Sequence, residues 1–160
     1  MTDKVHILFV CLGNICRSPT AHGVFRAAAE QAGLADRIRI DSCGTGDWHV
    51  GKKPDHRAME AAARRGVDIS DLRARQIQAA DLAEYDYILV MDRQNLDDVN
   101  RLWRQHGGTE PQLFLGYGDT GDTDEVPDPY YGGDEGFERV LDLIARASQG
   151  LLAEIRSQGH

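Results

Sequence analysis

Val5-His6-Ile7-Leu8-Phe9-Val10 runs directly into Cys11-Leu12-Gly13-Asn14-Ile15-Cys16-Arg17-Ser18-Pro19-Thr20, and this stretch decides the fold. The first six residues are β-branched and apolar enough to predict a strand buried on both faces, as in a parallel sheet. Ser18-Pro19 predicts the start of a helix, because Ser is a strong N-cap and Pro is favoured at the first helical position. A tight loop therefore joins a buried strand to a helix.

This loop has the features of an anion site. Backbone N–H groups at a helix N-terminus point at one spot, and the helix dipole adds partial positive charge there, so the spot binds a dianion such as phosphate. Arg17 would add a planar two-pronged donor for two phosphate oxygens. The same field favours a thiolate. We therefore expect Cys11 to be an ionised thiol aimed at bound phosphorus.

Hydrophobic spacing along the rest of the chain predicts alternating helices and strands. Helices are expected from Ser18 to Gly33, from His56 to Arg65 with Met59, Ala62 and Ala63 inward, from a cap at Asp92 to Gly107, and through Phe137 to Ile155. Strands are expected at 37–41, 87–91 and 112–115, with long loops at 42–55 and 116–133. The alternation predicts an α/β fold: a single three-layer domain over residues 1–160, with a four-stranded parallel open sheet and helices on both faces.

Three of the predicted loops should meet at one edge of this sheet. The loops that carry Cys11, Trp48 and Asp128 each follow a predicted strand. Ligands of open parallel sheets bind outside the carboxyl ends of the strands, at the switch point of the topology. The three distant loops therefore have a geometric reason to form one site.

Composition narrows the class of protein. The chain has 160 residues, which suits one domain with a core of its own. Its 18 basic and 26 acidic residues give a net charge of −8, which argues against nucleic acid or a membrane surface as partner. Three cysteines in a chain that needs no disulfide framework favour a reducing compartment, so we expect a cytoplasmic protein. The apolar run 5–12 is too short for a membrane span and lacks a signal-peptide cleavage site. The six histidines are scattered without the spacing of metal ligands, which makes a metal site improbable.

The string CLGNICRSP, with Cys11 and Arg17 five residues apart and Ser18-Pro19 behind them, resembles the signature loop of the low-molecular-weight protein tyrosine phosphatases. Asp128-Pro129-Tyr130-Tyr131 is similar to the second hallmark of that family. Further similar segments are Asp41-Ser42, Gly44-Thr45, Trp48, Ala74-Arg75-Gln76 and Val90-Met91-Asp92. The resemblance implies an enzyme that hydrolyses phosphotyrosine in proteins or peptides, releases inorganic phosphate, needs no metal or organic cofactor and works as a monomer.

The resemblance also implies roles for individual residues. Cys11 would attack phosphorus and form a cysteinyl-phosphate, while Asp128 protonates the leaving phenolate and then activates water. Ser18 would stabilise the Cys11 thiolate as it leaves. The phosphate would be held by Arg17 and by the loop residues Leu12, Gly13, Asn14, Ile15, Cys16 and Ser18.

Other residues would shape the loop and the pocket. Asn14, in a strained backbone conformation and hydrogen-bonded to Ser42, would hold the loop together with Ser18. Walls around the substrate ring would come from Leu12, Ile15, Trp48, Tyr130 and Tyr131, although Tyr131 is alternatively a regulatory phosphorylation site. Cys16 is either a redox partner of Cys11 or a small packing residue, and Cys43 is expected to be structural.

The chain departs from the family at one position and leaves three rival functions open. Leu72 stands where many relatives carry a histidine that supports the loop. A thiol-linked arsenate reductase would need two further cysteines late in the chain, and none follows Cys43. Protein-arginine phosphatases have Thr where this chain has Ile15. A silent phosphopeptide-binding module would not need Cys11, Arg17 and Asp128 together.

Overall fold

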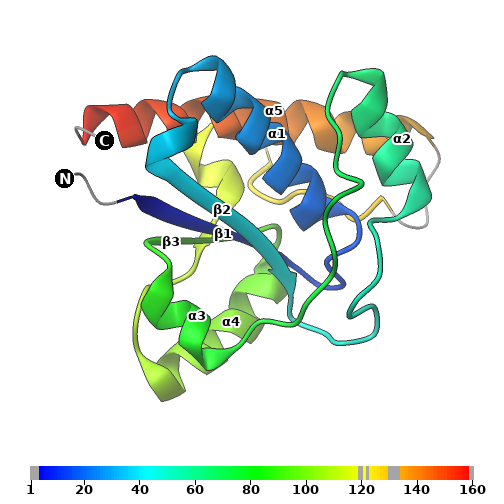
Figure 1. Cartoon of the computed structure of the whole chain (residues 1–160). Coiled ribbons are helices and arrows are strands. Elements are labelled where there is room, and N and C mark those ends of the chain that lie inside the picture. The colour runs from blue at the N-terminus through cyan, green and yellow to red at the C-terminus, as the bar shows by residue number, and fades with distance from the viewer. Residues whose placement is uncertain (1–3, 119–120, 122, 130–133, 159–160) are drawn as a thin grey trace.

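Figure 1 shows a computed structural model of the chain, which describes residues 4–118, 121, 123–129 and 134–158. Its elements are, in chain order, β1 (Val5–Cys11), α1 (Arg17–Gln31), η1 (Ala35–Arg37), β2 (Ile38–Gly44), α2 (His56–Arg64), α3 (Ala79–Glu84), β3 (Tyr87–Val90), α4 (Arg93–His106), β4 (Gln112–Leu113), η2 (Phe114–Tyr117) and α5 (Asp134–Ser157), where η marks a short 3-10 helix. The four strands form one parallel sheet in the order β2-β1-β3-β4. The predicted α/β fold with a four-stranded parallel sheet is therefore confirmed.

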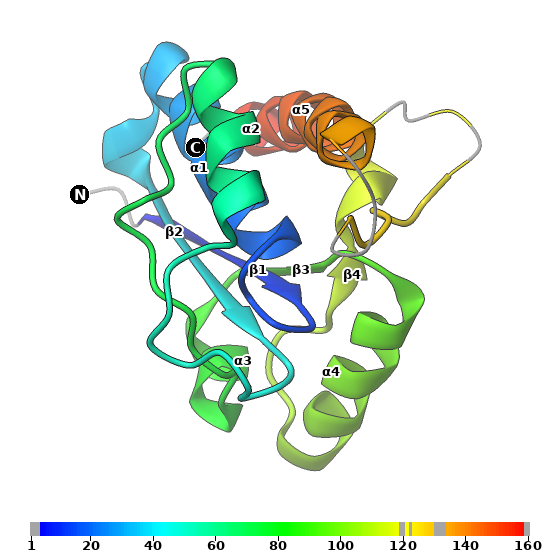
Figure 2. The same ribbon diagram turned by 90° about the vertical axis from the view of Figure 1, so that its right-hand side faces the viewer.

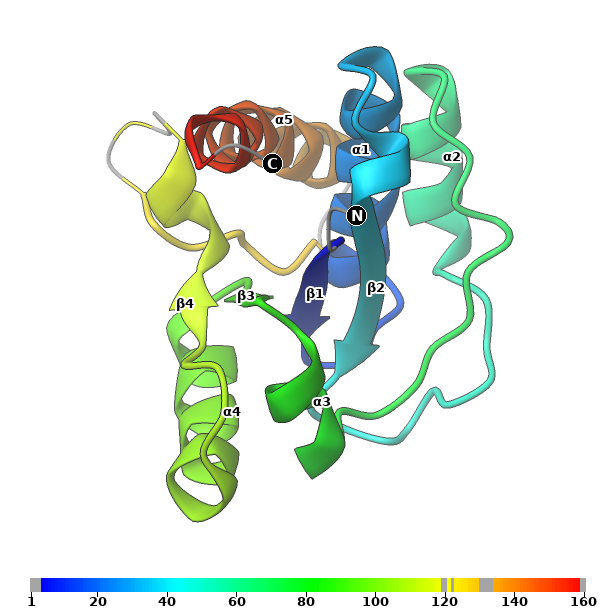
Figure 3. The same cartoon turned by 60° about the vertical axis from the view of Figure 1, so that its left-hand side comes forward.

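Strand β1 is buried on both faces, as its apolar sequence predicts. Side chains alternate along a strand, so Ile7 and Phe9 enter one core and Leu8 and Val10 enter the other. Figures 1 and 3 show what covers each face: α1, α2 and α5 lie on one side of the sheet, and α3 and α4 lie on the other. The arrangement has the three layers that the sequence predicts.

The sheet order places a switch point at the carboxyl end of β1. The chain leaves β1 to build β2 on one side and returns to build β3 on the other. The loops after β1 and β2 consequently emerge at the same edge, below the start of α1 in Figure 2. This edge is where ligands of such sheets bind.

Helix α1 begins one residue before the predicted cap. Arg17 is its first residue and Cys16 is its N-cap, without a side-chain capping bond, so the prediction that Ser18 caps the helix is wrong. The Ser18 hydroxyl instead contacts Cys11 and Asn14 in the preceding loop. A tertiary use of the hydroxyl has thus replaced the local one that helix propensity predicts.

Four smaller features also differ from the prediction. Strand β2 continues to Gly44 because it pairs with β1 as far as Cys11, so the following loop begins three residues later than predicted. In α2 the buried alanines are Ala58, Ala61 and Ala62, and Ala63 is exposed. Strand β4 ends at Leu113, where the chain tightens into η2. Helix α3 is unpredicted: it has six residues and a capping box between Gln78 and Asp81.

No helix in the described part of the chain is long and apolar enough to cross a membrane.

Candidate active site

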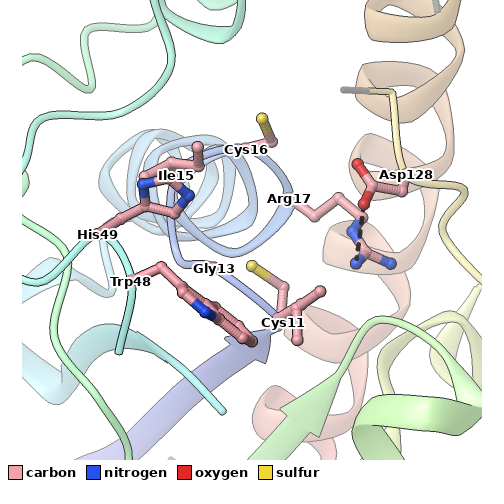
Figure 4. Close-up of a pocket in the computed structure, with 9 residues that line it drawn as sticks. Cys11, Gly13, Ile15, Cys16, Arg17, Trp48, His49 and Asp128 are labelled. Carbon is pink, nitrogen blue, oxygen red and sulfur yellow. Dashed lines mark ion pairs between the residues drawn. The ribbon is translucent and has the colours of Figure 1, made fainter. Parts of the chain in front are cut away.

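A pocket of about 230 Å³ opens at the carboxyl end of β1 (Figure 4). It is lined by Cys11, Leu12, Gly13, Ile15, Cys16, Arg17, Trp48, His49 and Asp128. These residues come from the segment that joins β1 to α1, with Cys11 at the end of β1 and Arg17 at the start of α1, from the loop after β2 and from the loop before α5. The structure therefore brings together the three segments that the sequence predicts to meet.

The Cys11 thiol lies at the bottom of this pocket, within reach of two hydrogen-bond donors. Its Sγ lies 2.9 Å from the Ser18 hydroxyl, and the Asn14 backbone N–H donates to it at 3.2 Å. A thiolate has no proton to give, so in that state both groups donate to sulfur. Both contacts stabilise negative charge on Sγ, which is what a nucleophilic cysteine requires.

Asn14 holds the loop in shape through both ends of its side chain. Its φ of 58° lies in the left-handed region, where Asn is one of the few side chains tolerated. Its amide nitrogen donates to Ser18 Oγ at 2.8 Å, and its amide oxygen accepts from the Arg75 backbone N–H at 3.0 Å. The predicted strained conformation is present, and the side chain ties the loop to helix α1 and to the 75–77 segment.

Ser42 does not bond Asn14 as predicted. Its hydroxyl pairs with His22 Nδ1 at 3.1 Å, inside the layer between β2 and α1. Burial, together with the nearby Arg26 charge, lowers the pKa of His22 to about 4, so the ring is neutral near pH 7. Sequence reasoning missed this residue, although His22 lies one helical turn after Ser18 and therefore on the same helix face. Leu72, the departure from the family pattern, packs into the apolar cluster that contains Ile69 and Phe137.

Arg17 is buried and is held on three sides. Its NH1 donates to Asp92 Oδ2 at 2.6 Å and to the Val126 carbonyl at 3.1 Å, and its NH2 lies 3.8 Å from Asp128 Oδ2. Burial opposes the charge of the guanidinium, but the neighbouring Cys11 and Asp92 more than offset it and raise the pKa of Arg17. The group is a fixed, permanent cation beside Cys11.

Asp92 has a second contact that the sequence did not predict. Its Oδ1 accepts from the Asn95 backbone N–H and caps α4, as predicted, while its Oδ2 accepts from Arg17. Asp128 lies beside the same guanidinium, across the pocket from Trp48 (Figure 4), and its side chain is 44% exposed. A carboxyl group in this position is open to solvent and lies beside the Arg17 guanidinium.

The opposite wall consists of exposed and partly exposed side chains. The indole of Trp48 is 66% exposed and lies over Gly46, where a Cβ would stand 1.9 Å from ring atom Cζ3. His49, which sequence reasoning missed, lies against Gly13 in the same way, with 3.0 Å between its Cδ2 and a Cβ built there. Figure 4 shows both rings across the pocket from Arg17. Leu12, Ile15 and Trp48 line the pocket as predicted, and the predicted walls Tyr130 and Tyr131 lie outside the described residues.

The three cysteines are free thiols in three different settings. Cys16 lines the same pocket as Cys11, and burial, followed by the charge of Asp55, raises its pKa to about 12. Cys43 is fully buried in the core beside α3 and α4, and its backbone carbonyl accepts from Ser18. Among the described residues, no group of three or more His, Cys, Asp or Glu side chains could hold a metal ion.

Comparison with known proteins agrees with this geometry. The family model of low molecular weight phosphotyrosine protein phosphatases matches residues 6–160. The enzyme of that name from Schizosaccharomyces pombe is 45% identical over 97% of this chain and 99% of its own. The crystal structure of YfkJ from Bacillus subtilis superposes with a TM-score of 0.91 at 38% identity, covering 99% of this chain and 98% of that one. The structure of a Drosophila arginine phosphatase superposes with a TM-score of 0.86 at 28% identity, covering 93% and 96%. The chain belongs to the low molecular weight phosphotyrosine protein phosphatase family and is a protein tyrosine phosphatase.

Proposed function

We propose that hydrolysis proceeds by two displacements at phosphorus on Cys11. The thiolate forms an S–P bond as the P–O bond to the tyrosine phenolate breaks, and Asp128 gives its proton to that oxygen. Asp128, now a carboxylate, then takes a proton from water, the water oxygen bonds to phosphorus, and the S–P bond breaks to release inorganic phosphate. The observation that carries this proposal is that Cys11, Arg17 and Asp128 line one small pocket, with two donors directed at Cys11 Sγ.

The other groups of the loop have supporting roles in this proposal. Arg17 and the backbone N–H groups from Leu12 to Ser18 bind the phosphate oxygens, and their geometry is kept by Asn14. The Ser18 hydroxyl, which already lies 2.9 Å from Cys11 Sγ, stabilises the thiolate as it leaves phosphorus. Ser42 acts indirectly, because its hydroxyl pairs with His22 rather than with Asn14. No metal or organic cofactor takes part.

Specificity for phosphotyrosine rests on the walls of the pocket. A slot bounded by Trp48, Ile15 and Leu12 accepts a flat aromatic ring, and a phosphate at its bottom reaches Cys11 only through a linker as long as a tyrosine side chain. Tyr130 and Tyr131 remain predicted walls. Ile15 places a branched apolar group where a phosphoarginine guanidinium would need a polar partner.

A panel of substrates tests this assignment. Peptides of one sequence carrying phosphotyrosine, phosphoserine or phosphoarginine are compared by kcat/KM, with arsenate reduction assayed alongside. We expect phosphotyrosine to be preferred by about 10²-fold or more over the other two, and no arsenate reduction. Comparable rates with phosphotyrosine and phosphoarginine would contradict the tyrosine assignment and favour an arginine phosphatase, the activity in the name of the Drosophila structural neighbour.

We infer that Cys16 protects Cys11 from irreversible oxidation. Peroxide converts a thiolate to a sulfenic acid, and a neighbouring thiol condenses with it to a disulfide, releasing water. Cys16 lines the same pocket, and its raised pKa keeps it a protonated thiol until that step. Cys16→Ser should keep most of its activity but lose recovery by thiol after peroxide treatment. Unchanged recovery in this variant would leave Cys16 as a packing residue.

The free thiols also bear on the compartment in which the protein works. We propose a monomeric enzyme of the cytoplasm that forms a single domain over residues 1–160. A reducing compartment suits three thiols that are all free and buried. Sedimentation of the purified chain at micromolar concentration tests the monomer.

A further inference from the structure

A second hollow, of about 450 Å³, borders the active-site pocket at Trp48. It runs between the loop after β2, the 76–77 segment and the exposed side of α4. Leu12 and Trp48 line both hollows, so the two share one wall. We call this second hollow the α4 groove, and its remaining apolar lining comes from Ile77 and Leu102.

The shared wall is unusually apolar for an exposed surface. Leu12 is 39% exposed and Trp48 is 66% exposed, and among the described residues the large hydrophobic side chains exposed to this degree are these two and Val50. Exposed apolar side chains that border a hollow mark a surface that binds something. Leu12 and Trp48 each contact the α4 groove as well as the active-site pocket, so one bound molecule can cover both faces of the wall.

Backbone hydrogen bonds hold the α4 groove in shape. Its floor is fixed by backbone hydrogen bonds: Gly46 N–H donates to the Leu12 carbonyl at 2.9 Å, and Ile77 N–H donates to the Gly44 carbonyl at 2.8 Å. Gly44 permits this close approach, because a Cβ there would stand 2.7 Å from the Leu12 carbonyl oxygen. A surface held in this way loses little conformational freedom on binding.

The charges on the rim cancel. Arg101 pairs with Asp98 at 2.6 Å, so these two rim residues of α4 neutralise each other. Gln105 adds an amide that can bond a peptide group. An apolar side chain carried on a polypeptide fits this lining better than an acidic or basic one.

We propose that the α4 groove binds an apolar side chain of the substrate itself, two residues from the phosphotyrosine. The proposal rests on the proposed function, since a phosphotyrosine in the active-site pocket must continue as a polypeptide across its rim. In an extended peptide, alternate side chains point the same way, so a side chain two positions along enters the neighbouring hollow when the phosphotyrosine enters the first. Trp48 then stands between the two side chains and contacts both.

The test compares peptides that differ only at these positions. Phosphotyrosine peptides with leucine at the −2 or the +2 position are measured against the all-alanine peptide, with nitrophenyl phosphate as a substrate that cannot reach the groove. We expect leucine at one of the two positions to raise kcat/KM by about tenfold, as burial of a leucine side chain implies. Equal kcat/KM for all three peptides would overturn the proposal.

Two variants of α4 locate the effect. Gln105→Trp fills the groove and should abolish the leucine preference while leaving nitrophenyl phosphate turnover unchanged. Arg104→Trp adds the same ring at a neighbouring exposed position outside the groove and should leave both unchanged. A leucine preference that survives Gln105→Trp places the binding site elsewhere and refutes this assignment. If the wild type hydrolyses neither nitrophenyl phosphate nor the peptides, the proposed function itself is refuted. Failure of the groove proposal and failure of the proposed function therefore give different results.

Discussion

The two sides of the active-site pocket are built in opposite ways. On one side, the Cys11 loop that lines the pocket is backed by the buried polar residues Asn14, Ser18 and His22, each hydrogen-bonded to another side chain. On the other side, Leu12 and Trp48 are exposed apolar residues, and the Trp48 indole rests on Gly46. Buried polar groups are costly to leave unpaired, whereas exposed apolar groups can be removed at little cost in stability. The polar side can therefore hold the reacting atoms in place, while the apolar side is free to select the substrate.

The largest expected effect lies at the centre of the buried side. Cys11→Ser should lower turnover of nitrophenyl phosphate by about 10⁴-fold or more, because a serine hydroxyl in this pocket has no base to ionise it. Phosphate or vanadate should still bind, since Arg17 and the loop are unchanged. Calorimetry with phosphate provides the binding control. Turnover above background in a clean preparation would move the nucleophile to another residue.

Asp128 does not fit the contrast between a buried polar side and an exposed apolar side. It is half exposed, yet it lies among the proposed reacting groups. Asp128→Ala should lower kcat by about 10²–10⁴-fold for phosphotyrosine peptides. The loss should be smaller for nitrophenyl phosphate, whose leaving group needs less protonation. A series of aryl phosphates with rising leaving-group pKa measures this directly. Equal losses across the series would exclude Asp128 as the acid.

The pH dependence of stability tests the buried side without any assay of activity. The unfolded chain protonates His22 near pH 6.5 and the folded protein only near pH 4, so the free energy of unfolding falls as the pH decreases through this window. At pH 5 the loss from this residue is about 2 kcal/mol relative to neutral pH. The charges that face the ring are those of Arg26, Asp41 and Asp71.

Urea denaturation of wild type and His22→Asn at pH 7 and pH 5 isolates this contribution. The asparagine amide can still pair with Ser42 but does not titrate. We expect the variant to lose about 2 kcal/mol less than the wild type between the two pH values. The same loss in both proteins would mean that His22 is not the titrating group.

The smallest effect on stability is expected at the exposed wall. Trp48→Ala should change the free energy of unfolding by less than about 0.5 kcal/mol. It should raise KM for phosphotyrosine peptides by about tenfold and change kcat by less than about twofold, because a stacking wall binds ground state and transition state alike. Gly46→Ala is the companion variant, since its methyl group must displace the indole. A fall in kcat with unchanged KM would contradict the comparison.

The sequence predicts the parts of this enzyme that are contiguous in the chain. Strand β1 and its loop follow from one stretch of sequence, the alternation of patterns predicts the sheet, and the strained Asn14 is implied by the resemblance of that loop to the family signature. The contact between His22 and Ser42 spans 20 residues, and that between Arg17 and Asp92 spans 75. Such pairs depend on how strands and helices come to lie side by side, which local patterns do not encode. Ser18 shows the same limit in reverse, because a contact with Cys11 overrides its tendency to cap a helix.

Asp92 places two requirements on a single codon. One carboxylate oxygen starts α4 and the other holds Arg17. Asparagine would keep the cap but lose the charge, and glutamate would keep the charge on a side chain one methylene too long to cap in the same way. Selection for folding and selection for catalysis therefore act on the same position. If selection for catalysis is relaxed, asparagine becomes acceptable there, but a residue that caps the helix is still required. Through Asp92, the start of α4, which borders the α4 groove, and the position of Arg17 in the active site depend on the same residue.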